Sequence, residues 1–153
     1  MCLNKAKKLN IVHDGTEIDR TCYKVLLVKG KWPFRKLHSP LWDDFTWKKN
    51  KMYSATACEE PDRTRIGDDK WEVDGRSFHS FMNLLDACFV AEEIKKNKQE
   101  DYRVYECIIP KDTRFVYEGE YGCGYGSYAS EKLIVKKQVY KAKGKKVLNI
   151  RFF

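Results

Sequence analysis

The amino-acid sequence predicts a single α+β domain: a mostly antiparallel, twisted sheet with one principal helix at about 81–96 and a C-terminal β-hairpin. Three observations predict this class. The chain has 153 residues, close to the usual size of one domain. One segment shows helical spacing of apolar residues, whereas most of the others are β-branched and aromatic runs that end at turn residues. Hydrophobic residues make up 42% of the chain, which supports one compact core.

The N-terminal half of the chain is predicted to contain an arm and two strands. Residues 1–20 are polar and basic without clear periodicity, so they are predicted to form an arm, and the domain spans 21–153. The first strand is 21–28 (TCYKVLLV), and a second strand is expected at 47–55. The polar segment CEEPDRTRIGDDK that follows is expected to be solvated.

The segment SFHSFMNLLDACFVAEEIKKNKQ predicts the principal helix. Ser80 is a suitable N-cap residue. Lysines near the end of the segment suit the negative end of the helix dipole. The residues at helical spacing, which we expect to face the sheet, are Phe81, Leu84, Leu85, Cys88, Phe89 and Ile94.

Four strands are predicted after the helix. Residues 101–109 and 113–121 form two of them, joined at Pro110-Lys111-Asp112. The segments EKLIVKKQVY and KKVLNIRFF are expected to pair as the terminal hairpin around Lys143-Gly144. Between these two pairs lies the glycine- and tyrosine-rich stretch GEYGCGYGSYAS at 119–130.

The net charge of +8 favours an anionic partner. Residues 131–153 contain eight basic residues and one acid. These lysines either protect an exposed strand edge or face a polyanion such as nucleic acid, and both interpretations stay open. The chain has no run of eighteen apolar residues and no signal peptide, so we expect a cytoplasmic protein that does not contact a membrane.

Cysteines and histidines do not predict a catalytic or metal site. The six cysteines are scattered without a CxxC pair, so we expect reduced, structural thiols, no metal and no cofactor. No catalytic residue is assigned, because the sequence has neither a G-x-S-x-G motif nor a Walker loop. We expect His79 to lie in the core or to hold the residues of a binding site in place without contacting the ligand itself.

The glycine-rich stretch is the candidate site. Its glycines permit close backbone approach, and its tyrosines offer ring faces and hydroxyls. It suits a small anionic nucleotide, and it equally suits a loop that folds over its own sheet. The residues that we expect to bind the ligand are Lys24, Arg114, Tyr121, Tyr125, Tyr128, Ser130 and Lys132.

The order of several short motifs resembles a family of small uncharacterised proteins of gut bacteria and their phages. These motifs are CYKVL, SP, W..NK.Y, FHSF, V.ECIIPK, YEGEY and YASEKLIV, and together they span about residues 21–137. The sequence departs from the family pattern at Arg76-Ser77 and at Asp112, where glycine is usual. The resemblance implies a phage or mobile-element accessory protein that acts in the cytoplasm of a bacterial host cell. It is compatible with an anti-defence role, either as a nucleotide-sequestering protein or as an inhibitor.

A more distant resemblance is to the fold of ADP-ribosyltransferases. It rests on Tyr23-Lys24 in the first strand, a strand that runs into a helix near 77–86, and Glu118-Gly119-Glu120. It implies that Lys24 would replace the arginine or histidine that holds the dinucleotide, and that Glu120 would polarise the ribose hydroxyl. The STS triplet of those enzymes is missing, and Ser77 and Ser80 lie near its place.

Three functions therefore stay open. The first is a protein without turnover that sequesters a small anionic nucleotide, such as a defence signal. The second is an inhibitor whose basic face binds a host protein or a nucleic acid. The third is an ADP-ribosyltransferase-like enzyme.

Overall fold

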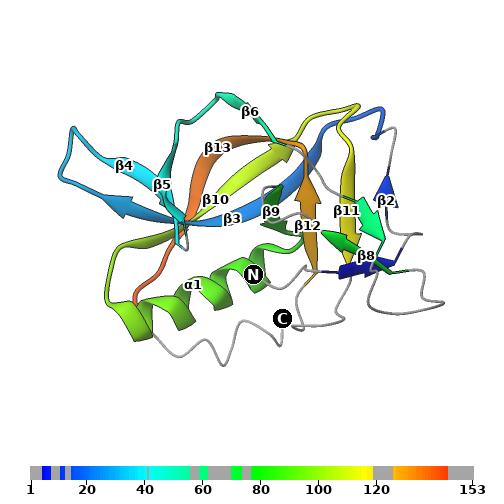
Figure 1. The fold of residues 1–153 in the computed structure, drawn as a ribbon. Coiled ribbons are helices and arrows are strands. Elements are labelled where there is room, and N and C mark those ends of the chain that lie inside the picture. Colours follow the sequence, from blue (N-terminus) through cyan, green and yellow to red (C-terminus); the bar gives the residue numbers. More distant parts are fainter. Residues whose placement is uncertain are drawn as a thin grey trace.

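The computed structural model describes residues 5–7, 11–12, 15–40, 42–55, 59–61, 70–73, 77–118 and 126–144. Within these ranges the protein is mostly antiparallel sheet with a single helix, α1 (Leu84–Lys98), as the α+β class predicts (Figure 1). No helix in the described part of the chain is long and apolar enough to cross a membrane.

The main sheet contains ten strands among the described residues, and their pairings are antiparallel. Eight of them follow one another in the order β2 (Ile11–Val12), β11 (Phe115–Glu118), β12 (Ser127–Ser130), β9 (Phe78–Phe81), β3 (Arg20–Lys29), β10 (Tyr102–Ile109), β13 (Lys132–Lys141) and β6 (Met52–Ser54). The other two, β4 (Lys36–Ser39) and β5 (Trp42–Trp47), attach to β3 through β4. A smaller sheet consists of β1 (Lys5–Lys7), β8 (Lys70–Val73) and β7 (Glu59–Pro61).

Strand β3 is the centre of the main sheet. One of its edges pairs with β10 continuously, from Arg20 opposite Ile109 to Leu27 opposite Tyr102. The other edge changes partner, because it meets β9 at Tyr23 and β4 from Leu27 onward. The predicted strand at 21–28 is therefore confirmed, with one further residue at each end.

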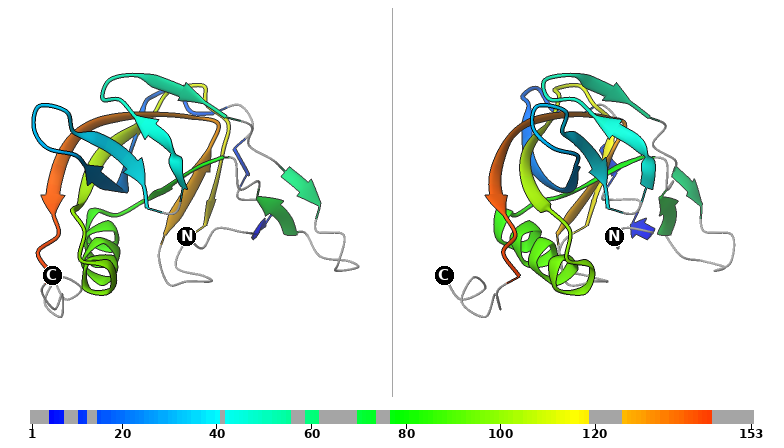
Figure 2. Two further views of the ribbon diagram at one scale, coloured as in Figure 1. Left: turned by 60° about the vertical axis from the view of Figure 1, so that its left-hand side comes forward. Right: turned by 90° about the vertical axis from the view of Figure 1, so that its left-hand side faces the viewer.

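The sheet curls, and its two faces are covered by different elements (Figure 2). Helix α1 covers one face and packs its small residues Ala87, Cys88 and Ala91 against β3 and β10. Strands β4, β5 and β6 bend over the opposite face, where Trp47 joins a second cluster around β3, β10 and β13. We call the sheet face that β4, β5 and β6 cover the inner face.

The principal helix begins later than predicted. Phe81 and the predicted N-cap Ser80 lie in β9, and Asn83 occupies the N-cap position. The stretch FHSF is extended because it pairs with SYAS of β12, and this ladder replaces the first helical turn. The predicted facing was wrong at Leu85, whose side chain is 41% exposed.

Three further predictions differ from the structure or lie outside it. The predicted strand at 47–55 is interrupted by a turn at Asn50, whose φ is 61°, so that β5 ends at Trp47 and β6 begins at Met52. Strand β13 pairs with β10 and β6, whereas its predicted hairpin partner at 145–153 lies outside the described residues. Parts of the predicted arm, β1 and β2, pair with β8 and β11.

Candidate functional site

Lys24 is the predicted ligand residue that the structure places most distinctively. It lies at the middle of β3, between Cys22 and Leu26, which both belong to the core on the inner face. Because alternate side chains of a strand share a face, Lys24 points to the inner face as well. Its side chain is buried, with 7% exposed, which is unusual for a lysine.

The amino group of Lys24 has few polar neighbours. Its Nζ donates a hydrogen bond of 2.6 Å to the carbonyl of His79 in β9. It also lies 5.4 Å from the ring centroid of Trp47, within the range of a cation–π interaction. Among the described residues no carboxylate forms an ion pair with it. Two of the three N–H donors of a protonated Lys24 therefore remain available there.

Burial determines the protonation states of Lys24, Cys22 and Cys107 on the inner face. It lowers the pKa of Lys24 to about 8, although the nearby thiols of Cys107 and Cys22 act in the opposite direction. Burial also raises the pKa of the Cys22 thiol to about 12 and that of Cys107 well above its usual value. Near neutral pH the site thus holds one cation beside two neutral thiols, both free of disulfides.

Two hydroxyl-bearing residues flank Lys24 across the sheet. Tyr105 of β10 lies directly opposite it. On the other side Tyr23 is opposite Phe81, which places Ser80 next to Lys24 on the inner face. The Ser80 hydroxyl is fully buried and makes no hydrogen bond of normal geometry among the described residues. It lies near enough to the Cys22 sulfur to moderate the rise in that thiol's pKa.

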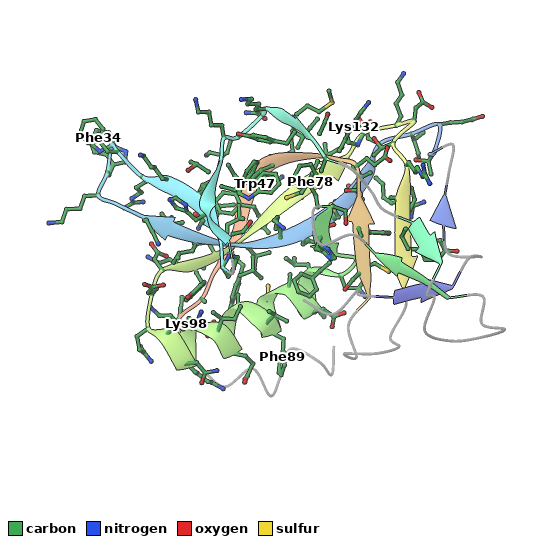
Figure 3. The ribbon with its side chains drawn as sticks, viewed as in Figure 1. Phe34, Trp47, Phe78, Phe89, Lys98 and Lys132 are labelled. Carbon is green, nitrogen blue, oxygen red and sulfur yellow. The ribbon has the colours of Figure 1, made fainter. Side chains whose placement is uncertain are left out.

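An aromatic cluster covers Lys24. Trp47 forms edge contacts with Phe45, Tyr53 and Phe78, with ring centroids 4.8, 5.1 and 5.2 Å away. Figure 3 shows Trp47 and Phe78 above β3, beneath the arch of β13 and β6. Trp47 is held in place because its Nε1 donates a 3.0 Å hydrogen bond to the hydroxyl of Ser39. Within the described part of the chain, the inner face thus packs aromatic rings around one buried cation.

Tyr128 and Ser130 lie on the same sheet but already have partners. Tyr128 is opposite Ser80, and its hydroxyl accepts a 3.2 Å hydrogen bond from Nη1 of Arg20. The guanidinium of Arg20 also lies 5.1 Å from the ring centroid of Phe115. Ser130 is fully buried and donates a 3.0 Å hydrogen bond to the carbonyl of Lys132.

Arg114 and Lys132 lie near the C-terminal end of β12. The carbonyl of Arg114 accepts a 3.1 Å hydrogen bond from the backbone of Glu131, at the end of β12 that is remote from Gly126. Lys132 is opposite Ser54 and alternates with the core residue Leu133, so it points away from the inner face. Of the predicted ligand residues, the structure brings Lys24, Tyr128 and Ser130 to one face.

The rest of the predicted site lies outside the described residues. This applies to Tyr121 and Tyr125, and to the last two residues of the Glu118-Gly119-Glu120 motif. His79 lies in β9, and its backbone carbonyl accepts the hydrogen bond from Lys24. Sequence reasoning missed Trp47 and Tyr105, whose only sequence signal is the alternation of apolar and polar residues.

The described parts of the chain also contain a cavity away from Lys24. This cavity of about 360 Å³ is lined by Leu27, Lys29, Pro40, Lys98 and Glu100 and includes none of the predicted ligand residues. No three His, Cys, Asp or Glu side chains within the described ranges are grouped as metal ligands.

Comparison of the chain with protein-family models, with curated proteins and with solved structures found no match. The chemistry of the described residues is therefore what supports a function.

Proposed function

We propose that this protein binds and sequesters a small anionic ligand of the nucleotide type, without turnover. The observation that carries the proposal is Lys24, a buried cation beneath an aromatic cluster, with no carboxylate partner among the described residues. A charge held away from water is unfavourable unless an opposite charge or hydrogen bonds compensate it. An anionic oxygen at Nζ would supply that compensation.

The neighbours of Lys24 suit the other parts of such a ligand. The Ser80 hydroxyl can donate to a second anionic oxygen, because it has no hydrogen bond of normal geometry among the described residues. The rings of Trp47, Phe45 and Phe78 offer apolar and edge contacts to a planar base. Arg114, Tyr121, Tyr125 and Lys132 stay sequence-based predictions for this ligand.

The resemblance of the sequence to small phage proteins of gut bacteria supports the biological setting. A phage accessory protein gains by withholding a nucleotide signal from a host defence system. Sequestration requires only binding, which agrees with a site built from one amine, one hydroxyl and ring surfaces. We therefore place the protein in the cytoplasm of a bacterial host cell, as a binding protein rather than an enzyme.

Isothermal titration calorimetry tests the proposal directly. The unmodified protein is titrated at pH 7 with a panel of cyclic dinucleotides, ADP-ribose and its cyclic forms. At least one should bind, and Lys24→Met should weaken it by about tenfold or more. Lys137→Met is the matched control, because it removes the same charge from an exposed position of β13 that is not among the predicted ligand residues. Lack of binding by every nucleotide up to about 1 mM would contradict the proposal.

The pH dependence of binding gives a second test that identifies the residue. An anion favours the protonated amine, so binding should raise the pKa of Lys24 from about 8. The protein should then take up protons on binding at pH 8 to 9, and its affinity should fall by up to about tenfold per unit above pH 8. Titrations in buffers of different ionisation enthalpy measure this uptake. Lys24→Met should show none of it.

A further inference from the structure

The turn between β3 and β4 carries two exposed aromatic rings. Its sequence is KGKWPFRK, at 29–36. The side chains of Trp32 and Phe34 are 78% and 81% exposed. Figure 3 shows Phe34 at the tip of the hairpin, far from the core. Since folding leaves these rings in water, the core does not explain why the turn contains them.

Cations surround the two rings and extend beyond them. Lys31 and Arg35 are adjacent to the rings in sequence, and Lys36 is opposite Lys29 where β3 pairs with β4. The next strand continues this series, because the pairing of Leu37 with Trp47 places Lys48 beside Lys36. Residues 29–36 and 48–51 contain the cations Lys29, Lys31, Arg35, Lys36, Lys48, Lys49 and Lys51 and no acid. All seven are exposed.

We propose that this surface, residues 29–36 and 48–51, binds single-stranded nucleic acid. Unpaired bases present faces on which exposed aromatic side chains stack, and lysine and arginine neutralise the phosphates between them. Both ingredients are interleaved here, with a cation on each side of the Trp32-Pro33-Phe34 tip. A duplex hides its base faces, so it would contact the cations alone. This surface differs from the Lys24 site, which is buried on the inner face. The proposal for this surface is therefore independent of the proposal that Lys24 binds a nucleotide.

The arrangement of the cations favours a nucleic acid over an anionic membrane. A membrane would meet the hairpin at its tip, where Trp32 and Phe34 would insert and only the nearest cations would contact headgroups. The cations instead continue across three neighbouring strands, a span of about 10 Å, and onto the separate turn between β5 and β6. Such a track suits an extended phosphate backbone.

Fluorescence anisotropy of labelled dT12 and rU12 tests the proposal at several salt concentrations. The unmodified protein should bind both, with affinity that falls steeply as salt rises, and should bind a duplex of equal length more weakly. The double variant Trp32→Ala, Phe34→Ala should lose about tenfold or more in affinity. The double variant Lys31→Gln, Arg35→Gln should lower the slope of log K against log salt by about 1.4.

Matched controls separate this surface from general basicity. Ile18→Ala removes another exposed apolar side chain, and Lys136→Gln with Lys137→Gln removes two charges from β13. Both should bind like the unmodified protein, and all variants should keep its melting temperature, because the altered side chains are largely exposed. Three results overturn the proposal: no binding of either oligonucleotide, equal weakening by the β13 variant, or binding that appears only with phosphatidylserine vesicles and is lost in the Trp32, Phe34 variant.

Discussion

At the scale of single residues, Lys24 makes the stability of the fold depend on pH. Its pKa in the folded protein is lowered to about 8 from an ordinary value of 10.5, because burial disfavours the charged amine. Between these pH values the unfolded chain binds more protons than the folded one, so the contribution of Lys24 to stability rises with pH. Below about pH 8 the folded protein carries the whole penalty, on the order of 3 kcal/mol.

Replacement of Lys24 by methionine should remove this dependence, because methionine fills similar space without an amine. In urea unfolding at pH 7 to 10.5, the stability difference between Lys24→Met and the unmodified protein should favour the variant most near pH 7 and shrink toward pH 10.5. Lys132→Met, on the other face, should run parallel to the unmodified protein. Parallel curves for Lys24→Met would show that the buried amine keeps its ordinary pKa.

Glu92 is a second buried charge, and it has well-defined partners. Its carboxylate accepts hydrogen bonds from the Tyr140 hydroxyl and from the backbone N–H groups of Lys143 and Gly144, the latter two at 2.9 and 2.7 Å. It therefore fixes the end of β13 to α1. Burial, reinforced by the bond to Glu92, raises the pKa of Tyr140.

Replacement of Glu92 by alanine should cost about 3 kcal/mol of unfolding free energy, because it leaves several donors without their charged acceptor. Hydrogen exchange at the amides of Lys143 and Gly144 should accelerate. Glu93→Ala is the control on the same helix. It removes a partly exposed ion pair with Lys96 and should cost about 0.5 kcal/mol or less. A similar loss in both variants would rule out a special role for Glu92.

At the scale of elements, the packing of α1 depends on its smallest residues. Leu85→Ala should cost less than about 1 kcal/mol, because the side chain is 41% exposed. Ala91→Leu should cost about 1 to 3 kcal/mol, since Ala91 is fully buried against the sheet and leaves no room for a larger side chain. Urea unfolding measures both. A larger loss for Leu85→Ala would restore the facing that helical periodicity predicted.

The sequence predicted the elements whose local pattern agrees with their long-range pairing. β3 and β10 are rich in β-branched and aromatic residues and lie near their predicted positions. The predicted start of α1 was wrong because FHSF has helical spacing when read with the residues after it. Its pairing with β12 depends on residues 46 to 52 positions later in the chain. Asn50 ended a predicted strand because asparagine tolerates a positive φ.

At the scale of the whole molecule, the candidate site depends on which residues of neighbouring strands lie opposite each other. These strands are far apart in the sequence, so no local pattern predicts their register. Lys24 was predicted as a basic residue of the first strand, where the resemblance to ADP-ribosyltransferases implies a ligand-holding cation, and the structure places it on the inner face. Its neighbours come from three other strands, since Phe78, His79 and Ser80 lie in β9, Trp47 in β5 and Tyr105 in β10. No spacing in the sequence predicts that these residues lie together. Arg114 and Lys132 were predicted from their charge, which does not reveal the face toward which a side chain points.

The central ladder between β3 and β10 also sets a time at which the protein can fold on the ribosome. Leu27 pairs with Tyr102 and Arg20 with Ile109. After β3 has been synthesised, roughly 80 further residues must therefore be added before β10, the strand with which it pairs continuously, is complete. At about 5 to 20 residues per second this delay is between about 4 and 16 s. During that interval a strand with five consecutive buried residues, Lys24 to Val28, has an unsatisfied edge that can pair with another nascent chain. Production of soluble protein should therefore benefit from slower initiation, which spaces the chains apart, more than from slower elongation, which lengthens the exposure of β3.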